Sequence, residues 1–124
     1  MNKICMLDIW QVNFDPSVGK EIQKTRPALV LSNNYYNLAS GTIFVVPLTS
    51  QIPKNIANPF YVSIEKNKTN KLSQNSFANV SQLRSVSKLR FIKKTGIVSL
   101  KQKEEILKRF LEITDTNILD LRYL

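Results

Sequence analysis

One short segment of this sequence combines residue types that suit chemistry on a charged substrate. Lys20, Glu21, Lys24 and Arg26 fall within seven residues, and Arg26 stands where an apolar run begins. A guanidinium at the start of a buried strand is anchored, and its planar fork binds phosphate bidentately. The connection that carries these four residues is roughly twelve residues long. It is longer than a simple turn requires, and its residue types favour a functional loop over a disordered one.

A second polar group follows directly on the strongest β pattern of the chain. Residues 42–46 read TIFVV, and Thr49, Ser50 and Gln51 follow shortly after them. Hydroxyl and amide side chains at the end of a buried strand need hydrogen-bond partners. This strand end is therefore predicted to build a site.

Both groups depend on a framework of short strands. The pattern predicts strands over residues 4–14, 26–32, 42–46, 60–64, 76–80 and 91–98. A turn is expected at Asp15-Pro16, and the apolar run Ala28-Leu29-Val30-Leu31 indicates burial on both faces. Five or six short strands joined by loops are typical of a small barrel. Trp10, the only tryptophan, is interpreted as a core or dimer anchor.

The remaining elements are helical or irregular. Ser99 and Gln102 form a predicted capping box at the start of a C-terminal helix. Pairs four residues apart on the exposed side of this helix are Glu104 with Lys108 and Glu105 with Arg109. Residues 33–41 are expected to be turns, residues 66–74 a basic loop and residues 87–90 a helical turn. Residues 115–124 are too apolar for a free tail and are expected to pack on this chain or on a second copy.

The length and charge restrict the class of protein. With 124 residues the chain is expected to form one domain over residues 1–124 that buries about two thirds of its unfolded surface. Its formal net charge is +9, and the stretch from Lys66 to Lys103 holds ten basic residues and no acidic one. Such a stretch is either a solvated lysine-rich surface or a binding site for a polyanion, meaning nucleic acid or an acidic protein.

Two residue types are scarce enough to exclude whole classes of site. Cys5 is the only cysteine and the chain has no histidine. An intrachain disulfide and a cysteine-rich metal site are thereby excluded, and zinc is not expected. No signal peptide and no run of 18 apolar residues is present, so the sequence predicts a cytoplasmic protein without a membrane span.

Four segments, taken in order, closely resemble the MazF/PemK family of toxin endoribonucleases from toxin–antitoxin systems. These segments are DIWQVNFDP from residue 8, RPALVLSN from residue 26, VVPLTSQ from residue 45, and SQLRSV from residue 81 with RFIKKTGIVS from residue 90. The similarity runs from residue 8 to about residue 113. It implies an SH3-like small β-barrel of the MazF/PemK/CcdB type, mainly β with a C-terminal helix, assembled as a homodimer. It also implies sequence-specific cleavage of single-stranded RNA, mRNA included, with a 2′,3′-cyclic phosphate product, and inhibition by an antitoxin with an acidic segment.

The resemblance also implies roles for particular residues. The essential arginine of the family falls on Arg26, the essential threonine on Thr49 and the loop glutamate on Glu21. The segment around Gln82 and Arg84 is similar to a strand that contacts the substrate, and Ser50 and Gln51 are expected to contact RNA beside Thr49. Two differences from the family stand out: Leu7 occupies a position that is glycine in many relatives, and the chain continues past the usual end of the family.

These residues can support cleavage by the 2′-OH of the RNA itself, which requires neither metal nor cofactor. With no histidine, a pair of histidines is ruled out. Arg26 is expected to stabilise the phosphorane and, as a second possibility, to donate a proton to the leaving oxygen. Thr49, assisted by Ser50, would hydrogen-bond a phosphate oxygen. Glu21 is the candidate general base, with a surface salt bridge to Lys24 or Arg26 as the alternative interpretation.

Two other interpretations of the sequence stay open at this point. The same barrel serves toxins of the CcdB type, which bind DNA gyrase through a Trp-Gly-Ile ending, whereas this chain ends Leu121-Arg122-Tyr123-Leu124. The chain could also be an inactive relative that binds RNA or antitoxin without cutting. Exposed aromatic rings that stack on bases are common in binders of single-stranded RNA. Tyr35, Tyr36 and Phe77 are the candidates here, with packing as the alternative role.

Overall fold

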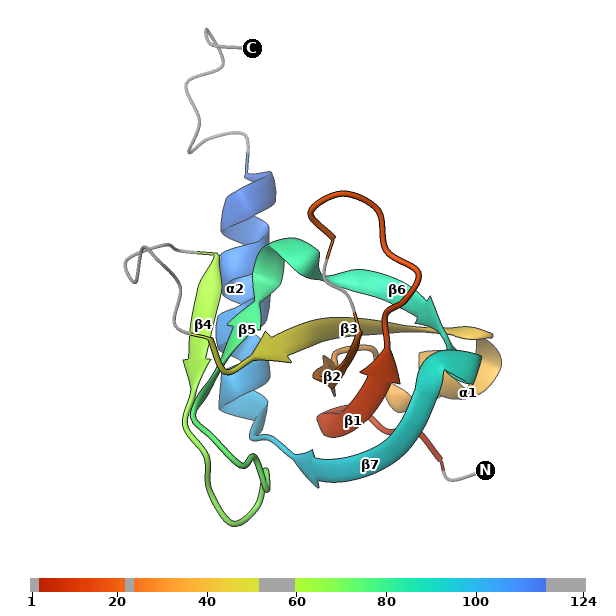
Figure 1. Ribbon diagram of the computed structural model, residues 1–124, viewed down its shortest axis with the longest axis horizontal. Coiled ribbons are helices and arrows are strands. Elements are labelled where there is room, and N and C mark those ends of the chain that lie inside the picture. The colour runs from red at the N-terminus through yellow and green to blue at the C-terminus, as the bar shows by residue number, and fades with distance from the viewer. Residues whose placement is uncertain (1–2, 22–23, 52–59, 116–124) are drawn as a thin grey trace, which may run out of the picture.

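In the computed structural model, which describes residues 3–21, 24–51 and 60–115, seven strands join in one antiparallel sheet accompanied by two α-helices (Figure 1). The elements in order are β1 (Asp8–Asn13), β2 (Thr25–Val30), α1 (Asn34–Ala39), β3 (Thr42–Thr49), β4 (Tyr61–Ile64), β5 (Ser76–Asn79), the 3-10 turn η1 (Val80–Gln82), β6 (Arg84–Ser87), the 3-10 turn η2 (Lys88–Arg90), β7 (Phe91–Ile97) and α2 (Leu100–Thr114). The strand order is β4-β5-β3-β2-β1-β7, with β6 also paired to β3. A mainly β fold with a C-terminal helix is confirmed.

Strand β3 is the organising strand of the sheet. One edge of β3 pairs with β2, and the other edge pairs first with β6 and then, toward its end, with β5. Figure 1 shows β3 crossing the molecule, with α1 beside its start and β4, β5 and α2 beside its end. The strand runs through Pro47 to Thr49, which is further than the predicted residues 42–46. Its extension places the predicted polar group at the strand end.

The sheet is strongly curved but does not close by strand pairing. Its terminal strands are β4 and β7, which are not hydrogen-bonded neighbours. The loop between β4 and β5 contacts β7 instead, and the Ile97 N–H donates to the Thr69 carbonyl at 3.2 Å. The structure is therefore an open, barrel-like sheet, consistent with the expected SH3-like barrel.

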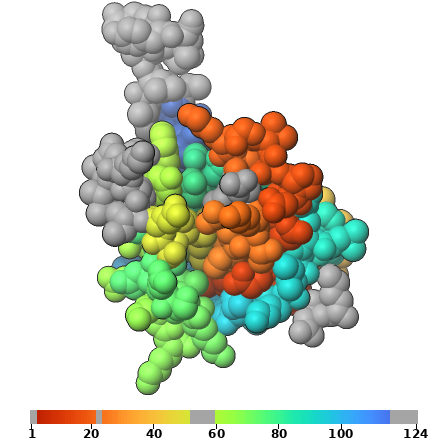
Figure 2. Space-filling view, viewed as in Figure 1, coloured from red at the N-terminus to blue at the C-terminus, as the bar shows by residue number. Residues whose placement is uncertain are grey.

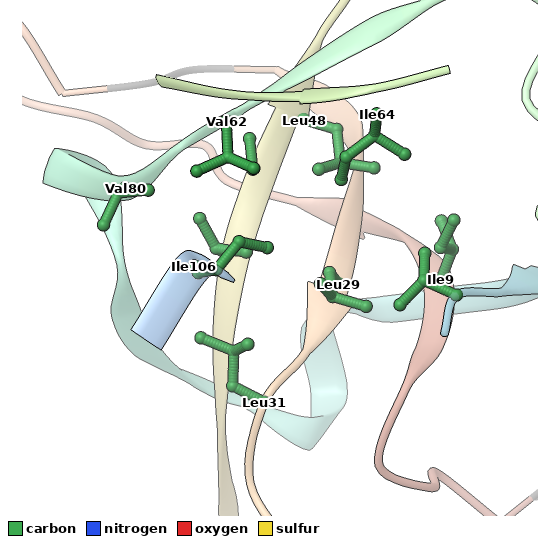
Figure 3. Close-up of a cluster of buried hydrophobic side chains, with 11 residues drawn as sticks. Ile9, Leu29, Leu31, Leu48, Val62, Ile64, Val80 and Ile106 are labelled. Carbon is green, nitrogen blue, oxygen red and sulfur yellow. The ribbon is translucent and has the colours of Figure 1, made fainter. Parts of the chain in front are cut away.

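Two hydrophobic clusters fill the interior. One contains Ile9, Leu29 and Leu48 together with Ile106 of α2, and Figure 3 shows these side chains lying close to one another. The second contains Trp10, Phe14 and further residues of β1, β2, β3, β6 and β7. Residues 28–31 are all buried and contribute to both clusters, which confirms burial on both faces of β2.

Helix α2 begins as its sequence predicts. The Ser99 hydroxyl accepts from the Gln102 N–H at 3.3 Å, and the Gln102 side chain accepts from the Ser99 N–H at 3.4 Å. On the helix surface Arg109 pairs with Glu112 at 3.0 Å, three residues away, rather than with the predicted Glu105. The packing predicted for residues 115–124 lies outside the described residues from residue 116 onward. In the part of the chain that the structure describes, every helix is too short or too polar to cross a bilayer.

Two predicted elements differ from the structure. Residues 33–41 were expected to be turns but contain α1, whose first turn is capped by the Asn33 side chain, which accepts from the Tyr36 N–H at 2.8 Å. The first strand begins at Asp8 rather than at residue 4, because Leu7 has φ of 77°. This left-handed backbone costs a residue with a Cβ roughly 1–2 kcal/mol. Leu7 thus adopts a backbone conformation that glycine, which has no Cβ, adopts without this cost.

A buried carboxylate holds the start of β1. Asp8 is 2% exposed, and its Oδ2 accepts from the Cys5 N–H at 2.9 Å and from Trp10 Nε1 at 3.0 Å. Its Oδ1 lies 3.2 Å from Lys94 Nζ on β7. Trp10 is also in edge contact with Phe91 at 5.8 Å between ring centroids. The single tryptophan is therefore a core residue tied to the strand that bears it.

Replacing Asp8 with asparagine is expected to lower the free energy of unfolding by about 1–2 kcal/mol, because an amide keeps an acceptor but loses the charge that faces Lys94. Urea unfolding monitored by Trp10 fluorescence measures this loss. Asp15→Asn is the matched control, since Asp15 is exposed and also accepts one backbone N–H, from Lys24 at 2.9 Å. Equal effects of the two substitutions would show that the buried network contributes nothing.

Candidate active site

A polar pocket of about 370 Å³ lies where β2 begins and β3 ends. Three of the predicted site residues line it, namely Arg26, Thr49 and Ser50. Figure 2 shows the face where the first residues of β2 (orange) and the last of β3 (yellow) adjoin the β4–β5 loop (green). Two segments separated by more than twenty residues in the sequence therefore supply one site.

The register of β2 and β3 explains why Arg26 and Thr49 meet. Ala28 pairs with Pro47 in the antiparallel ladder. Continuing this register by two residues brings Arg26 opposite Thr49, at the point where the strands separate. Both residues are half-buried, and Arg26 also pairs with Val12 of β1. The guanidinium-bearing residue and the hydroxyl-bearing residue are thus fixed by two ladders, which restricts their positions as catalysis requires.

Thr49 also shapes the turn that follows β3. Its Oγ1 accepts a hydrogen bond from the Gln51 N–H at 3.2 Å. The hydroxyl proton remains available as a donor, since a hydroxyl can accept and donate at once. Ser50 is exposed beside it, and Gln51 follows outside the pocket lining. The end of β3 therefore presents two hydroxyl groups at the pocket.

The β4–β5 loop and β7 complete the pocket with residues that the sequence pattern did not identify. Lys71, Ser73 and Gln74 come from the loop and Thr95 comes from β7. Lys71 belongs to the basic stretch noted in the sequence, but its distance from Arg26 along the chain concealed that it lines the same pocket. Arg26 and Lys71 are the charged residues among the described lining. The pocket consequently favours an anion.

Glu21 does not line this pocket. It lies in the loop between β1 and β2, where its Oε1 accepts from the Val18 N–H at 2.8 Å and its own N–H donates to the Val18 carbonyl at 3.2 Å. The carboxylate is exposed and stabilises a turn of its own loop. The alternative interpretation of Glu21, a surface salt bridge to Lys24 or Arg26, stays a prediction.

The base of the β1–β2 loop is firmly held. The Phe14 N–H donates to the Lys24 carbonyl at 3.0 Å, and the Lys24 N–H donates to Asp15 Oδ1 at 2.9 Å. Arg90 reaches across from η2 and donates to the Asn13 carbonyl at 3.0 Å and to the Asp15 carbonyl. These hydrogen bonds therefore fix the backbone at Lys24, two residues before Arg26, and so define where the chain enters β2.

Gln82 and Arg84 do not line the pocket either. Arg84 begins β6 opposite Val45, and its guanidinium carbon lies 5.9 Å from the centre of the Phe14 ring. Gln82 lies in η1, which packs against α2. The structure thus divides the predicted RNA contacts into a group at the pocket and a group beyond it.

The aromatic candidates lie in different places. Phe77 of β5 pairs with Thr49 and is partly exposed, so its ring adjoins the end of β3. Tyr35 and Tyr36 lie on α1, where Tyr35 is 83% exposed and Tyr36 packs on Phe44 at 5.5 Å between centroids. Hydrogen bonds with the side chains of Ser40 and Thr42 lower the pKa of Tyr36. Of the aromatic candidates, Phe77 is therefore the one placed closest to the predicted chemistry.

Within the described ranges, no group of three or more histidine, cysteine, aspartate or glutamate side chains could hold a metal ion.

Comparison with known proteins places this geometry in context. Residues 6–114 match the family model of the PemK-like, MazF-like toxin of type II toxin–antitoxin systems. The chain is 39% identical to endoribonuclease MazF9 of Mycobacterium tuberculosis over 114 residues, which cover 86% of this chain and 94% of that protein.

Solved structures show the same fold. The crystal structure of MazF from Deinococcus radiodurans superposes with a TM-score of 0.79 at 23% identity and covers 92% of this chain and 98% of the other. A crystal structure of MazE–MazF from the same organism has a TM-score of 0.71 at 22% identity, with 94% and 99% covered. The expected barrel-like fold with its C-terminal helix is thereby confirmed.

Proposed function

The chain belongs to the PemK-like, MazF-like toxin family of type II toxin–antitoxin systems and is an endoribonuclease, and we propose that it cuts single-stranded RNA at specific sequences without a metal ion. The substrate class includes mRNA. The 2′-oxygen attacks the neighbouring phosphorus and the bond to the 5′-oxygen breaks, which leaves a 2′,3′-cyclic phosphate and a 5′-OH.

One observation carries this proposal: Arg26 and Thr49, from different strands, line the same small polar pocket. Lys71 adds a second positive charge and Ser50 a second hydroxyl. An anionic group with several oxygens, such as a phosphodiester, matches this set of donors. Because the sequence contains no histidine, acid–base roles must fall to other groups.

We assign the roles as follows. Arg26 donates to two non-bridging oxygens and stabilises the charge of the phosphorane as it develops, since preorganised donors act most strongly where charge appears. Thr49 donates its hydroxyl proton to a phosphate oxygen, and Ser50 assists. The proton lost by the 2′-OH passes to a base, and the leaving 5′-oxygen takes a proton from an acid, for which Arg26 is the candidate.

Glu21 is the proposed base, and its position outside the pocket requires its loop to approach the bound RNA. Glu21→Gln is expected to lower kcat by about a hundredfold, at the lower end of what a general base contributes. Lys20→Gln, a neighbouring exposed residue, is the control. An unchanged rate for Glu21→Gln would show that the base assignment is wrong.

The deciding experiment incubates the pure protein and its Arg26→Ala variant with a long single-stranded RNA in EDTA. New ends are mapped by sequencing and tested for cyclic phosphate. Discrete cuts by the wild-type protein alone would establish the reaction and reveal the recognition sequence. Binding of RNA by both proteins without cutting would instead favour an inactive relative.

We further propose that Gln51, Gln82 and Arg84 contact the RNA away from the scissile phosphate, since these residues lie outside the pocket lining. The proposed inhibitor is an antitoxin protein with an acidic segment, supported by the MazE–MazF complexes of Deinococcus radiodurans and by the net charge of +9. We also propose a homodimer, which light scattering of the purified protein would test.

A further inference from the structure

An open basic cleft adjoins the candidate active site on the side formed by the β4–β5 loop and β7. Its volume is about 560 Å³, and its lining includes Lys68, Lys71 and Lys94 with Thr69 and Thr95. Lys71 and Thr95 also line the pocket that contains Arg26 and Thr49. The two cavities are therefore adjacent, and one lysine borders both.

We propose that this cleft is a second phosphate subsite, which holds a phosphodiester of the RNA next to the one that is cut. The inference rests on the proposed function, because it extends the path of the same substrate. A strand of RNA carries one phosphate per nucleotide, so a chain that leaves the first pocket past Lys71 brings its next phosphates toward Lys68 and Lys94.

The charges of the cleft favour an anion. All three lysines are exposed, and among the described residues Lys68 and Lys71 make no ion pair, whereas Lys94 pairs with the buried Asp8. The lining of the cleft contains no carboxylate among the residues that the structure describes. Lys68 and Lys71 therefore have no acidic partner within the described ranges, and a partly open cleft of this size is within the range of ligand sites.

The loop that carries Lys68 and Lys71 is preorganised. Asn70 is fully buried, and its Oδ1 accepts from the Asn67 and Leu72 N–H groups at 3.0 and 3.1 Å. Its Nδ2 donates to the Glu65 carbonyl at 2.8 Å. A loop fixed by its own side chains loses little entropy when a ligand binds. These internal bonds indicate a built surface for the lysines rather than a solvated tail.

Strand β7 fixes the position of the loop relative to the active site. The Ile97 N–H donates to the Thr69 carbonyl, and Gly96 lies so close to the loop that an added Cβ would be 2.1 Å from the Asn70 carbonyl oxygen. The same strand carries Lys94 and Thr95 to the cleft. Loop and strand thus present their lysines at a set distance from Arg26.

The test uses Lys68→Ala, because Lys68 borders the cleft and not the catalytic pocket. Lys66→Ala is the matched control, since Lys66 lies in the same loop with the same charge but lines neither cavity. The substrate is a single-stranded RNA with one mapped cleavage site, made with a single neutral methylphosphonate at each flanking position in turn. Cleavage in EDTA and binding by fluorescence anisotropy are both measured.

With wild-type protein, one flanking methylphosphonate should weaken binding and raise KM about fivefold, with kcat nearly unchanged. Lys68→Ala should lose a similar amount of affinity for the unmodified RNA and lose no more with that methylphosphonate. The slope of its log binding constant against log salt concentration should be smaller in magnitude by about 0.7. Lys66→Ala should behave as wild type. Such coupling between one lysine and one phosphate is not produced by a general change in charge.

Equal sensitivity of wild type and Lys68→Ala at every flanking phosphate would overturn the subsite while the proposed function stands. If Lys68→Ala binds RNA normally but loses affinity for an acidic antitoxin segment, the cleft is a protein site and the proposal is wrong. If the wild-type protein cuts no RNA, the proposed function fails, and the anisotropy measurement alone then decides the subsite.

Discussion

Replacing Arg26 with alanine is expected to lower kcat by about a hundredfold to a thousandfold, the loss that follows removal of one preorganised contact to a developing negative charge. Arg26 is half-buried at the start of β2 and lines the pocket with Thr49. Truncation to alanine therefore removes the guanidinium donors of Arg26. A flexible lysine at this position could not place its donors in the same geometry. Single-turnover cleavage of a mapped RNA measures this effect without interference from product release.

Two further variants separate this role from simple charge. Lys24→Ala removes one positive charge two residues earlier, from an exposed residue outside the pocket lining, and should change kcat less than about threefold. Arg26→Lys keeps the charge but loses the planar fork and should recover only part of the activity. If Lys24→Ala is as slow as Arg26→Ala, the effect of Arg26 is electrostatic steering of the RNA and not stabilisation of the phosphorane.

The central strands and the terminal helix were predictable because local pattern and tertiary environment agree there. Residues 28–31 are apolar without interruption and are buried on both faces of the sheet. Ser99 and Gln102 identify the helix start by a rule that involves only neighbouring residues. Helix α1 was missed because its residues, NYYNLA, have weak helix propensity, and its side-chain cap at Asn33 is equally typical of a turn.

The candidate site was predictable only in part, for a related reason. Arg26 and Thr49 could be identified from the strands that carry them and from the family resemblance. Lys71 and Thr95 reach the same pocket because the β4–β5 loop docks on β7, a contact between segments whose packing no short-range pattern records. Glu21 shows the reverse, since nearness to Arg26 in sequence did not place it in the pocket lining.

Gly96→Ala is expected to destabilise the fold by about 3 kcal/mol, the upper part of the range for overpacking a well-filled interior. An added Cβ would lie 2.1 Å from the Asn70 carbonyl oxygen and 2.5 Å from its carbonyl carbon. Both atoms are backbone, so no side-chain rotation relieves the overlap. Either β7 or the β4–β5 loop must shift, and a shift of the loop also disturbs the buried hydrogen bonds of the Asn70 side chain.

Gly41→Ala is the matched control, because nothing lies within 4 Å of its added Cβ and its φ is not in the left-handed region. Thermal unfolding should show a melting temperature about 10 °C lower for Gly96→Ala and nearly unchanged for Gly41→Ala. Any folded Gly96→Ala protein should also cleave RNA more slowly, since the displaced loop carries Lys71 away from Arg26. A Gly96→Ala protein that melts with the wild type would show that the loop does not dock on β7, and the second phosphate subsite would lose its structural support.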